Sequence, residues 1–361
     1  MSVDILITGT GMFAGRMALD IAATAQHPVK VMVAGRNTDR LDWLRTAGNA
    51  RAAMFGTPAK IVTHEIDLME EGASERILDI AQPRIVVQAA SIQTSSVIAQ
   101  KGSKWTDLVS RGGLSATAVF QAIISSRMAR AIEATCPGAH YINCSFPDVV
   151  NGMISEMGYD VLCGTGNVAI LSNVFEGAIS GSDKGRLRVL AHYQNLAPWR
   201  QPADRRADAV PPRVFVGDKE VEDVFATFRD TRLTPEPAIE ISGASGVTLM
   251  LALAANQTWY GHAPAPHGRP GGYPVKFEDG VFGLDLPTGV DEAAAVAWND
   301  AFERRNGMTV GQGRAQFHGT LHEMLSNEGF VHADGFALCD LEEVHHDFAA
   351  LRDRLSAQGS T

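Results

Sequence analysis

The chain has 361 residues, 45% of them hydrophobic and 20% charged, which is the composition of an ordinary globular protein and long enough for two domains. Its formal net charge of −10 argues against nucleic acid or an anionic membrane surface as the main partner. No apolar run reaches the length of a membrane span, and the four cysteines show no C-x-x-C spacing. We therefore expect a cytoplasmic protein with free thiols and no signal peptide.

The first predicted element is a buried parallel strand, ILIT, followed at once by a glycine-rich turn and a helical apolar pattern. The turn reads Gly9-x-Gly11-x-x-Ala14, the Gly/Ala version of the dinucleotide-binding fingerprint. Gly9 would permit the tight turn, Gly11 would let the backbone approach a pyrophosphate, and Ala14 would let the helix pack closely on the strand. Met12 and Phe13 lie at the helix start, whose free N–H groups would bind the phosphates.

The second predicted strand, Val29–Ala34, ends in Gly35-Arg36-Asn37. Folds that prefer NAD usually carry an Asp or Glu near this point for the ribose 2′-OH, and this segment has neither. Arg36, with Asn37 beside it, could instead pair with the 2′-phosphate of NADP, so we predict NADP as cofactor, with NAD possible. A solvated turn arginine is the alternative. Asp67, after the third strand, would meet the adenine edge or cap the next helix.

Further strand-then-helix units predict a doubly wound parallel Rossmann sheet in residues 1–180. The fourth strand ends in Ala89-Ala90-Ser91, small residues whose backbone would lie against the cofactor. The polar segment Gln93–Gly113 would be an active-site loop or an ordinary surface loop. The predicted strands are 5–8, 29–34, 60–67, 84–91, 140–145 and 161–163, and the predicted helices are 16–22, 38–47, 69–81 and 115–135.

Residues 181–361 differ in character and predict a second, α+β domain that would bind the substrate and form an oligomer interface. Short hairpins with glycine-containing turns alternate with helices in this part of the chain. The predicted helices 247–259 and 291–305 carry more apolar surface than a two-domain monomer needs, which favours a homodimer. The other predicted elements are strands 186–193, 213–221, 274–277, 280–286 and 314–317, and helices 320–327 and 341–356.

Two resemblances to known families follow from these motifs. Over residues 3–150, the segments GTGMFAG and VAGRN together with Asp67 resemble the NADP-binding domain of saccharopine dehydrogenase-like Rossmann oxidoreductases. The second resemblance rests on order: Asn143, a Gly-Thr-Gly-Asn turn, His192 at a strand end, and a hairpin before a C-terminal helix. This order is similar to that of the lactate/malate dehydrogenases and the NAD-dependent family 4 glycosidases. Both resemblances imply chemistry that depends on a nicotinamide cofactor.

The second resemblance implies that Asn143 lies near the nicotinamide and the substrate, and that His192 is the catalytic acid/base. Imidazole titrates near neutrality, which suits a proton-transferring group; a structural, hydrogen-bonded histidine is the alternative. Tyr141 and Asp148 are the next candidates, and Asp148 would hold a cationic substrate or cap the following segment. No Asp follows the Gly-Thr-Gly-Asn turn closely to orient the histidine, and no Arg follows to clamp a substrate carboxylate.

We therefore expect hydride transfer between NADP(H) and a small polar carbonyl/alcohol or imine/amine substrate. One alternative is redox-recycling lyase or family 4 glycosidase-like chemistry, in which the cofactor is reduced and reoxidised within one turnover. Another alternative is a non-catalytic NADP-binding sensor. His318 and His322 have the i, i+4 spacing of helical metal ligands, but the order is not H-E-x-x-H and no third ligand is evident, so no metal is predicted.

Overall fold

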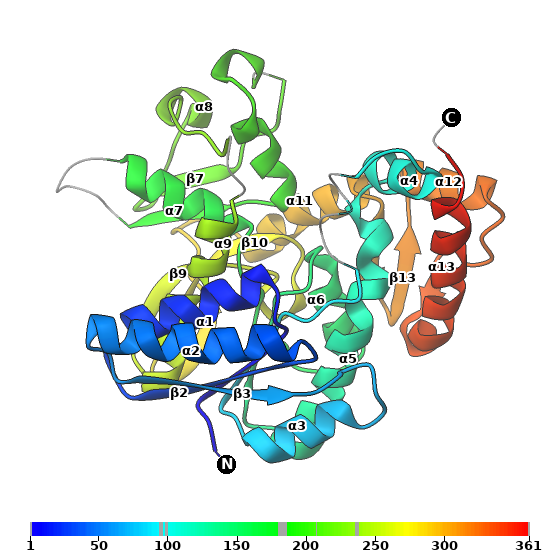
Figure 1. Ribbon diagram of the computed structural model, residues 1–361. Helices are drawn as coiled ribbons and strands as arrows, with labels where there is room; N and C mark the ends of the chain where they lie inside the picture. Colours follow the sequence, from blue (N-terminus) through cyan, green and yellow to red (C-terminus); the bar gives the residue numbers. More distant parts are fainter. Residues whose placement is uncertain are drawn as a thin grey trace.

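The computed structural model describes residues 2–93, 97, 100–179, 186–206, 208–234 and 238–359. Its centre is a five-stranded sheet in the order β3-β2-β1-β4-β5, and all neighbouring strands in it are parallel (Figure 1). The strands are β1 (Ile5–Thr8), β2 (Val29–Gly35), β3 (Ala59–Glu65), β4 (Ile85–Gln88) and β5 (His140–Asn143). The predicted doubly wound Rossmann sheet is confirmed. Its strand order reverses between β1 and β4, the point at which open sheets bind ligands.

Helices cover both faces of this sheet (Figure 1). They are α1 (Met12–Thr24) and α2 (Thr38–Phe55) on one face, and α3 (Ala73–Ala81) and α5 (Ala118–Thr135) on the other. In β1, Ile5 and Ile7 pack into the core that contains α1 and α2, whereas Leu6 packs into the core that contains α3 and α5. Successive side chains of a strand point to opposite faces, so a strand covered on both faces is apolar throughout.

The predicted sixth strand at 161–163 is wrong. Cys163 makes a single parallel bridge to Ile142 of β5 and extends no further along the sheet. The reason is the next residue, Gly164, whose N–H donates to the carbonyl of Pro264 at 2.8 Å instead of continuing alongside β5. The chain therefore leaves the sheet after one bridge, and the sheet ends at β5.

Two other predicted elements have different boundaries. The segment 93–113 is not one loop, because it contains helix α4 (Lys104–Gly112), which Ser103 caps and whose Trp105 is buried; residues 94–96 and 98–99 lie outside the described residues. The predicted helix 247–259 is α10 (Val247–Ala255), because Asn256 takes a left-handed conformation with φ 50°. Trp259 then begins strand β9 (Trp259–Pro264), which the Pro- and Gly-rich sequence had hidden.

The second half of the chain is an α+β arrangement, as predicted, built on three small antiparallel sheets. They contain β6 (Leu187–Leu190), β7 (Arg213–Val216) and β8 (Lys219–Glu220); β9, β10 (Gly272–Glu278) and β11 (Val281–Leu284); and β12 (Met308–Gly311), β13 (Arg314–Phe317) and β14 (Phe336–Ala337). The remaining helices are α6 (Val149–Glu156), α7 (Val168–Ala178), α8 (Val224–Thr227), α9 (Ile239–Ser245), α11 (Glu292–Arg305), α12 (Gly319–Asn327) and α13 (Leu341–Ser356).

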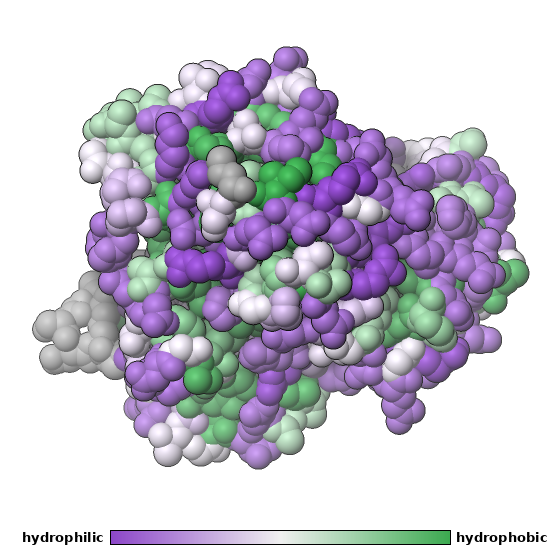
Figure 2. Space-filling view, turned by 90° about the horizontal axis from the view of Figure 1, so that it is seen from below, coloured by the Kyte–Doolittle hydropathy of each residue, from purple (hydrophilic) through white to green (hydrophobic). Residues whose placement is uncertain are grey.

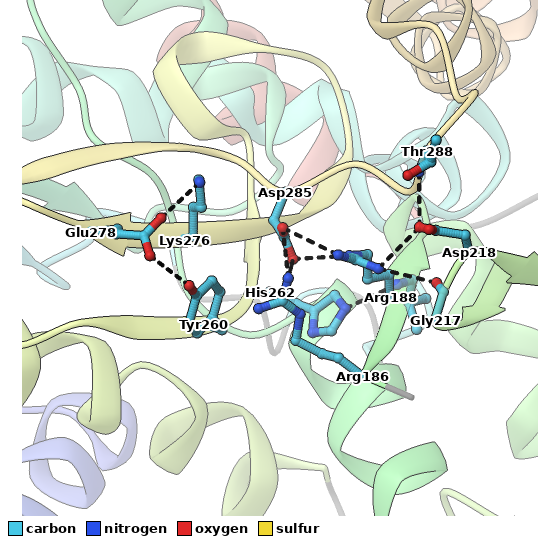
Figure 3. A network of polar contacts seen from close by, with 11 residues as sticks. Arg186, Arg188, Gly217, Asp218, Tyr260, His262, Lys276, Glu278, Asp285 and Thr288 are labelled. Atoms are coloured by element: carbon cyan, nitrogen blue, oxygen red, sulfur yellow. Dashed lines mark hydrogen bonds and ion pairs between the residues drawn. The ribbon is translucent and has the colours of Figure 1, made fainter. Parts of the chain in front are cut away.

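A polar network joins two of these sheets (Figure 3). Asp285, just after β11, forms ion pairs with Arg186 at 2.7 Å and with Arg188 of β6 at 3.0 Å. Beside them, the N–H of Val189 donates to Nε2 of the half-buried His262 on β9. Burial and the two neighbouring guanidinium groups lower the pKa of His262 to about 3, so this imidazole is neutral at physiological pH and serves as an acceptor.

The two halves of the chain share their cores. Leu6 of the Rossmann sheet belongs to the same apolar cluster as Phe348 of α13, and Ile7 belongs to the same cluster as Tyr273 of β10. The predicted domain boundary at residue 180 lies outside the described residues, so the division into two domains stays a prediction. No helix in the described part of the chain is both long and apolar enough to cross a membrane.

The apolar surface that suggested a homodimer is largely buried within the chain. Val247, Leu249, Met250 and Leu253 of α10 all pack into the core beside the Rossmann sheet. On the face shown in Figure 2, hydrophilic side chains surround smaller hydrophobic patches. Large exposed apolar side chains occur instead on α2, at positions 43, 54 and 55.

Candidate functional site

The glycine turn after β1 lies between the ends of two other strands. The N–H of Gly9 donates to the carbonyl of Ala34, at the end of β2, at 2.7 Å. Gly9 has a φ of +104°, and a Cβ atom at this position would lie 2.9 Å from the backbone of Ala89 and Ala90, just after β4. The turn therefore needs a glycine here for both conformation and space.

Gly11 faces open space. It is the N-cap residue of α1, and a Cβ atom added to it would meet nothing within 4 Å. No side chain caps this helix start, and Met12 is 73% exposed, whereas Ala14 is buried against the sheet. An open helix N-terminus beside a glycine is what a pyrophosphate requires, because the free N–H groups and the helix dipole attract anions. The residues present therefore fit a dinucleotide.

The predicted contacts to the adenosine half have structural partners as well. Arg36 lies 3.7 Å from Asp67, and both side chains are exposed. Asp67 also accepts a hydrogen bond from the N–H of Met69, so it closes a local turn and does not cap α3. Asn37 is the N-cap residue of α2, where its side chain accepts from the N–H of Arg40.

Sequence reasoning missed Arg40. Its Nε donates to the carbonyl of Thr10 in the glycine turn at 3.3 Å, and its guanidinium would lie 2.9 Å from a Cβ atom at Gly15. Its sequence position could have indicated this contact. Arg40 lies three residues after Asn37, in the first turn of α2, and that turn faces α1. A second cation therefore stands beside the glycine turn.

Buried amides arrange the segment after β4. Gln88 accepts from the hydroxyl of Thr8 and donates to the carbonyl of Ala90 at 2.8 Å. Ser91 donates to the side chain of Gln121 on α5, also at 2.8 Å. These bonds hold the backbone of residues 89–91 next to the glycine turn. The sequence predicts that this backbone contacts the cofactor. Gln88 and Gln121 were not predicted as site residues, because a single polar residue inside an apolar strand or helix gives no functional signal by itself.

At the end of β5, the two predicted residues lie on the same face of the strand, and both contact Ser125 of α5. Asn143 is buried; it accepts from the hydroxyl of Ser125 at 3.0 Å and donates to Asn151 at 2.6 Å. Tyr141 is also buried, and its hydroxyl donates to the backbone carbonyl of Ser125 at 2.9 Å. Burial raises the pKa of Tyr141 well above its ordinary value. Of the other predicted catalytic residues, the structure brings Tyr141 close to Asn143, through their shared partner Ser125.

In the structure, His192 has an acidic neighbour, although no suitable Asp follows the Gly-Thr-Gly-Asn turn closely in the sequence. Its side chain is fully buried, and its Nε2 lies 3.2 Å from Oε1 of Glu303, a buried residue of α11. Its Nδ1 accepts from the N–H of Gln194 at 3.2 Å, so the ring proton belongs on Nε2. Sequence reasoning missed Glu303 because it lies far along the chain, on a helix whose charged residues look solvent-facing.

Asp148 lies in the same place. Its Oδ1 accepts from Nδ2 of Asn167, the N-cap residue of α7, and its charge interacts with that of Glu303. Burial, and to a lesser extent Glu303, raises the pKa of Asp148 to about 8, so this carboxyl group is mostly protonated at neutral pH. We call Asp148, His192 and Glu303 the buried acid cluster.

Helix α9 connects this cluster to the glycine turn. A Cβ atom at Gly243 of α9 would lie 2.6 Å from Arg16 of α1, and Arg16 forms an ion pair with Glu240 of α9. At the other end of α9, Ser245 accepts from the N–H of Gly166 at 3.1 Å. Gly166 immediately precedes Asn167, which bonds Asp148. The glycine turn and the buried acid cluster thus lie one short helix apart.

Other conspicuous groups have ordinary partners. His318 contacts the hydroxyl of Thr309 at 2.7 Å, and His322 bonds Asp334 at 2.8 Å. Within the described ranges, no three His, Cys, Asp or Glu residues are arranged to hold a metal ion. Two surface cavities, of about 520 and 330 Å³, lie elsewhere, beside the start of α3 and between α1 and α10.

Comparison with known proteins places the fold. No family model matches the sequence, and no curated protein matches it either. Solved structures do match. The fold is that of the lactate and malate dehydrogenases. A lactate dehydrogenase from Cryptosporidium parvum, complexed with lactic acid and nicotinamide adenine dinucleotide, is 15% identical with a TM-score of 0.55, over 84% of this chain and 96% of that one.

Two malate dehydrogenases are similarly related. The enzyme from Plasmodium falciparum, in complex with NADH, is 9% identical with a TM-score of 0.54, over 84% of this chain and 97% of that chain. The enzyme from Salinibacter ruber is 12% identical with a TM-score of 0.53, over 91% of this chain and all of the other. These neighbours agree with the order-based resemblance and give no support to the saccharopine dehydrogenase-like one.

Proposed function

We propose that the protein is an NAD(P)-dependent oxidoreductase that acts on a small polar carbonyl/alcohol or imine/amine substrate. One observation carries the proposal: an open glycine turn and a buried acid cluster lie one short helix apart, joined through α9. Solved structures with this fold that contain NAD or NADH support the choice of cofactor class.

The cofactor would lie along the carboxyl ends of β1, β2 and β4. The free N–H groups at the start of α1 would bind its pyrophosphate, with Gly11 leaving room for the backbone approach. When bound, a nicotinamide accepts or donates a hydride. Residues 89–91 would support it from β4, and Asn143 would fix the adjoining end of β5 through Ser125 and Asn151.

The buried acid cluster would donate or accept the proton that is transferred together with the hydride. His192 would hold its proton on Nε2, which faces the carboxylate of Glu303. The backbone N–H of Gln194 donates to Nδ1, so that nitrogen carries no proton. Asp148, whose pKa of about 8 lies near physiological pH, can hold or release a second proton with little free-energy cost. The burial of all three groups excludes water from this region.

NADP is the proposed preference over NAD. Arg36 carries an exposed guanidinium at the end of β2, and Arg40 adds a second one beside the glycine turn. Two guanidinium groups suit a phosphate that can accept paired hydrogen bonds. Asp67, which lies 3.7 Å from Arg36, would exchange that contact for one with the adenosine when the 2′-phosphate binds.

The test is absorbance at 340 nm with NADP or NADPH and a panel of small carbonyls, alcohols, amines and imines. We expect a net change that His192→Gln lowers by about 10²–10⁴-fold without loss of dinucleotide affinity. His318→Gln, a histidine outside the cluster, is the control and should keep full activity. Product without a net absorbance change would favour the redox-recycling alternative, and dinucleotide binding without any product would favour the sensor.

A further inference from the structure

The buried acid cluster contains an excess of hydrogen-bond acceptors. Eight buried side-chain nitrogen and oxygen atoms in the described part of the chain have no hydrogen-bond partner. Four of them belong to this cluster: Oδ2 of Asp148, Nε2 of His192 and both carboxylate oxygens of Glu303. Nε2 of His192 and Oε1 of Glu303 lie 3.2 Å apart and face each other, which leaves Oδ2 of Asp148 and Oε2 of Glu303 as two carboxyl oxygens without a partner. Buried polar groups are nearly always satisfied, so such a concentration points to a ligand that donates hydrogen bonds.

Glu303 also gives the cluster a net negative charge, and Asp148, mostly protonated at neutral pH, would add a second one when a bound cation displaces its proton. Because Nδ1 of His192 accepts from a backbone N–H, its ring carries one proton and is neutral. Among the described residues, no Lys or Arg forms an ion pair with Asp148 or Glu303. A buried carboxylate without a cation costs several kcal/mol, so a positive ligand would remove that cost.

The cluster lies one side chain below the surface. Asn167, Tyr193 and Gln194 are half-buried and contact Asp148 and His192 directly: Asn167 bonds Asp148, the Tyr193 ring centre lies 4.3 Å from that of His192, and the Gln194 N–H bonds His192. Phe146, also half-buried, packs edge-on against Tyr193 at 4.8 Å. A substrate group that displaces this layer would reach the carboxyl oxygens.

We propose that the buried acid cluster binds the protonated amino group of the substrate, so that the enzyme acts on a small amine and not on a 2-hydroxy acid. An ammonium group has three donors and no acceptor, which suits the two carboxyl oxygens that lack a partner. The same oxygens would repel a substrate carboxylate. This inference rests on the proposed function, because it takes the cluster as the substrate end of that site.

Three probes of similar size test the charge preference: 2-aminoethanol, ethylene glycol and glycolate. Their affinities for the full-length protein at pH 7 would be measured by calorimetry or ligand-observed NMR, with and without NADP. We expect 2-aminoethanol to bind at least about tenfold more tightly than glycolate. Glu303→Gln and, separately, Asp148→Asn should reduce this ratio toward one. Glu292→Gln, an exposed acid on the same helix, is the matched control and should leave it unchanged.

The outcomes separate this inference from the proposed function. Three results would each overturn the inference. Glycolate could bind as tightly as 2-aminoethanol, 2-aminoethanol could fail to bind, or the preference for the amine could persist in both folded cluster variants. Far-ultraviolet circular dichroism checks that each variant is folded, and the wild-type ratio tests the preference by itself if a variant is not. NADP binding is measured independently, so a protein that binds NADP but prefers glycolate would retain the proposed function and lose the amine assignment.

Discussion

Gly9 and Gly11 are two residues apart, yet a side chain would meet different surroundings at each. At Gly11 it would enter open space, so Gly11→Val should fold normally and lower dinucleotide affinity on the order of 100-fold. At Gly9 it would collide with the backbone after β4 at a positive φ, so Gly9→Val should lower the free energy of unfolding by about 2–3 kcal/mol. Calorimetric titration and urea denaturation of both variants measure this. Full dinucleotide affinity in Gly11→Val would exclude this turn as the binding site.

Arg36 should determine which dinucleotide binds. Arg36→Asp removes the proposed partner of the 2′-phosphate and places a second carboxylate beside Asp67, so NADP affinity should fall by about 1–3 kcal/mol while NAD affinity changes little. Arg45→Asp, on the same helix as Arg40 but paired with Asp42, is the control. Dissociation constants for both dinucleotides would be compared, and an unchanged NADP to NAD ratio in Arg36→Asp would refute the preference.

Asp148 should make the free energy of unfolding depend on pH. Its carboxyl group has a pKa of about 8 in the folded protein and about 4 when unfolded. Between these values the folded state holds one more proton than the unfolded state, so the contribution of Asp148 to stability decreases as pH rises from about 4 to 8. The slope is at most about 1.4 kcal/mol per pH unit. Asp148→Asn should remove it, as urea denaturation across this pH range would reveal; identical slopes in the two proteins would contradict the assignment.

Among the elements of the fold, β6 and the hairpin of β10 and β11 depend on the Asp285 network. Arg188 and Asp285 are each only slightly exposed and form the closer of the two ion pairs of Arg188, whose other partner is the exposed Asp218 at 3.5 Å. Asp285→Asn should lower the free energy of unfolding by about 3 kcal/mol, since it leaves two guanidinium groups without their shared carboxylate. Glu292→Gln breaks an exposed pair and should cost under about 1 kcal/mol. Equal effects of the two substitutions would show that the network is not important for stability.

Most elements of the first half could be predicted from the sequence, because strands buried on both faces form apolar runs that local patterns reveal. Elements that depend on distant partners could not. β9 contains a glycine and a proline and becomes a strand only by pairing with β10. Cys163 lies in an apolar stretch that looks like a strand, but a hydrogen bond from Gly164 to Pro264 turns the chain away.

The site was partly predictable for the same reason. The glycine turn is a local motif, and its residues lie together as the fingerprint requires. The partner of His192 is not local: Glu303 reaches it from α11, and no spacing rule connects the two positions. Tyr141 lies two residues before Asn143 on the same face of β5, and both side chains bond Ser125 of α5, a distant partner that no local pattern reveals.

For the molecule as a whole, we still predict a homodimer, but through α2 and not through α10. The solvent-facing side of α2 carries Trp43 and Met54, which are 57% and 75% exposed, separated by three helical turns with alanines 47 and 50 between them. Two antiparallel copies would place each tryptophan on the partner's methionine and alanine on alanine. Light scattering should give a dimer, and Trp43→Glu should give a monomer. A monomeric wild type at micromolar concentration would remove this prediction.

The identity of the cofactor bears more directly on function than the proposed two-domain organisation or the proposed cytoplasmic location. The central claim is that the glycine turn holds a nicotinamide dinucleotide, so the most direct measurement is a calorimetric titration of the wild-type protein with NADP and, separately, with NAD. The account predicts one site per chain, micromolar affinity for at least one dinucleotide, and tighter binding of NADP. Absence of binding to both dinucleotides would contradict it.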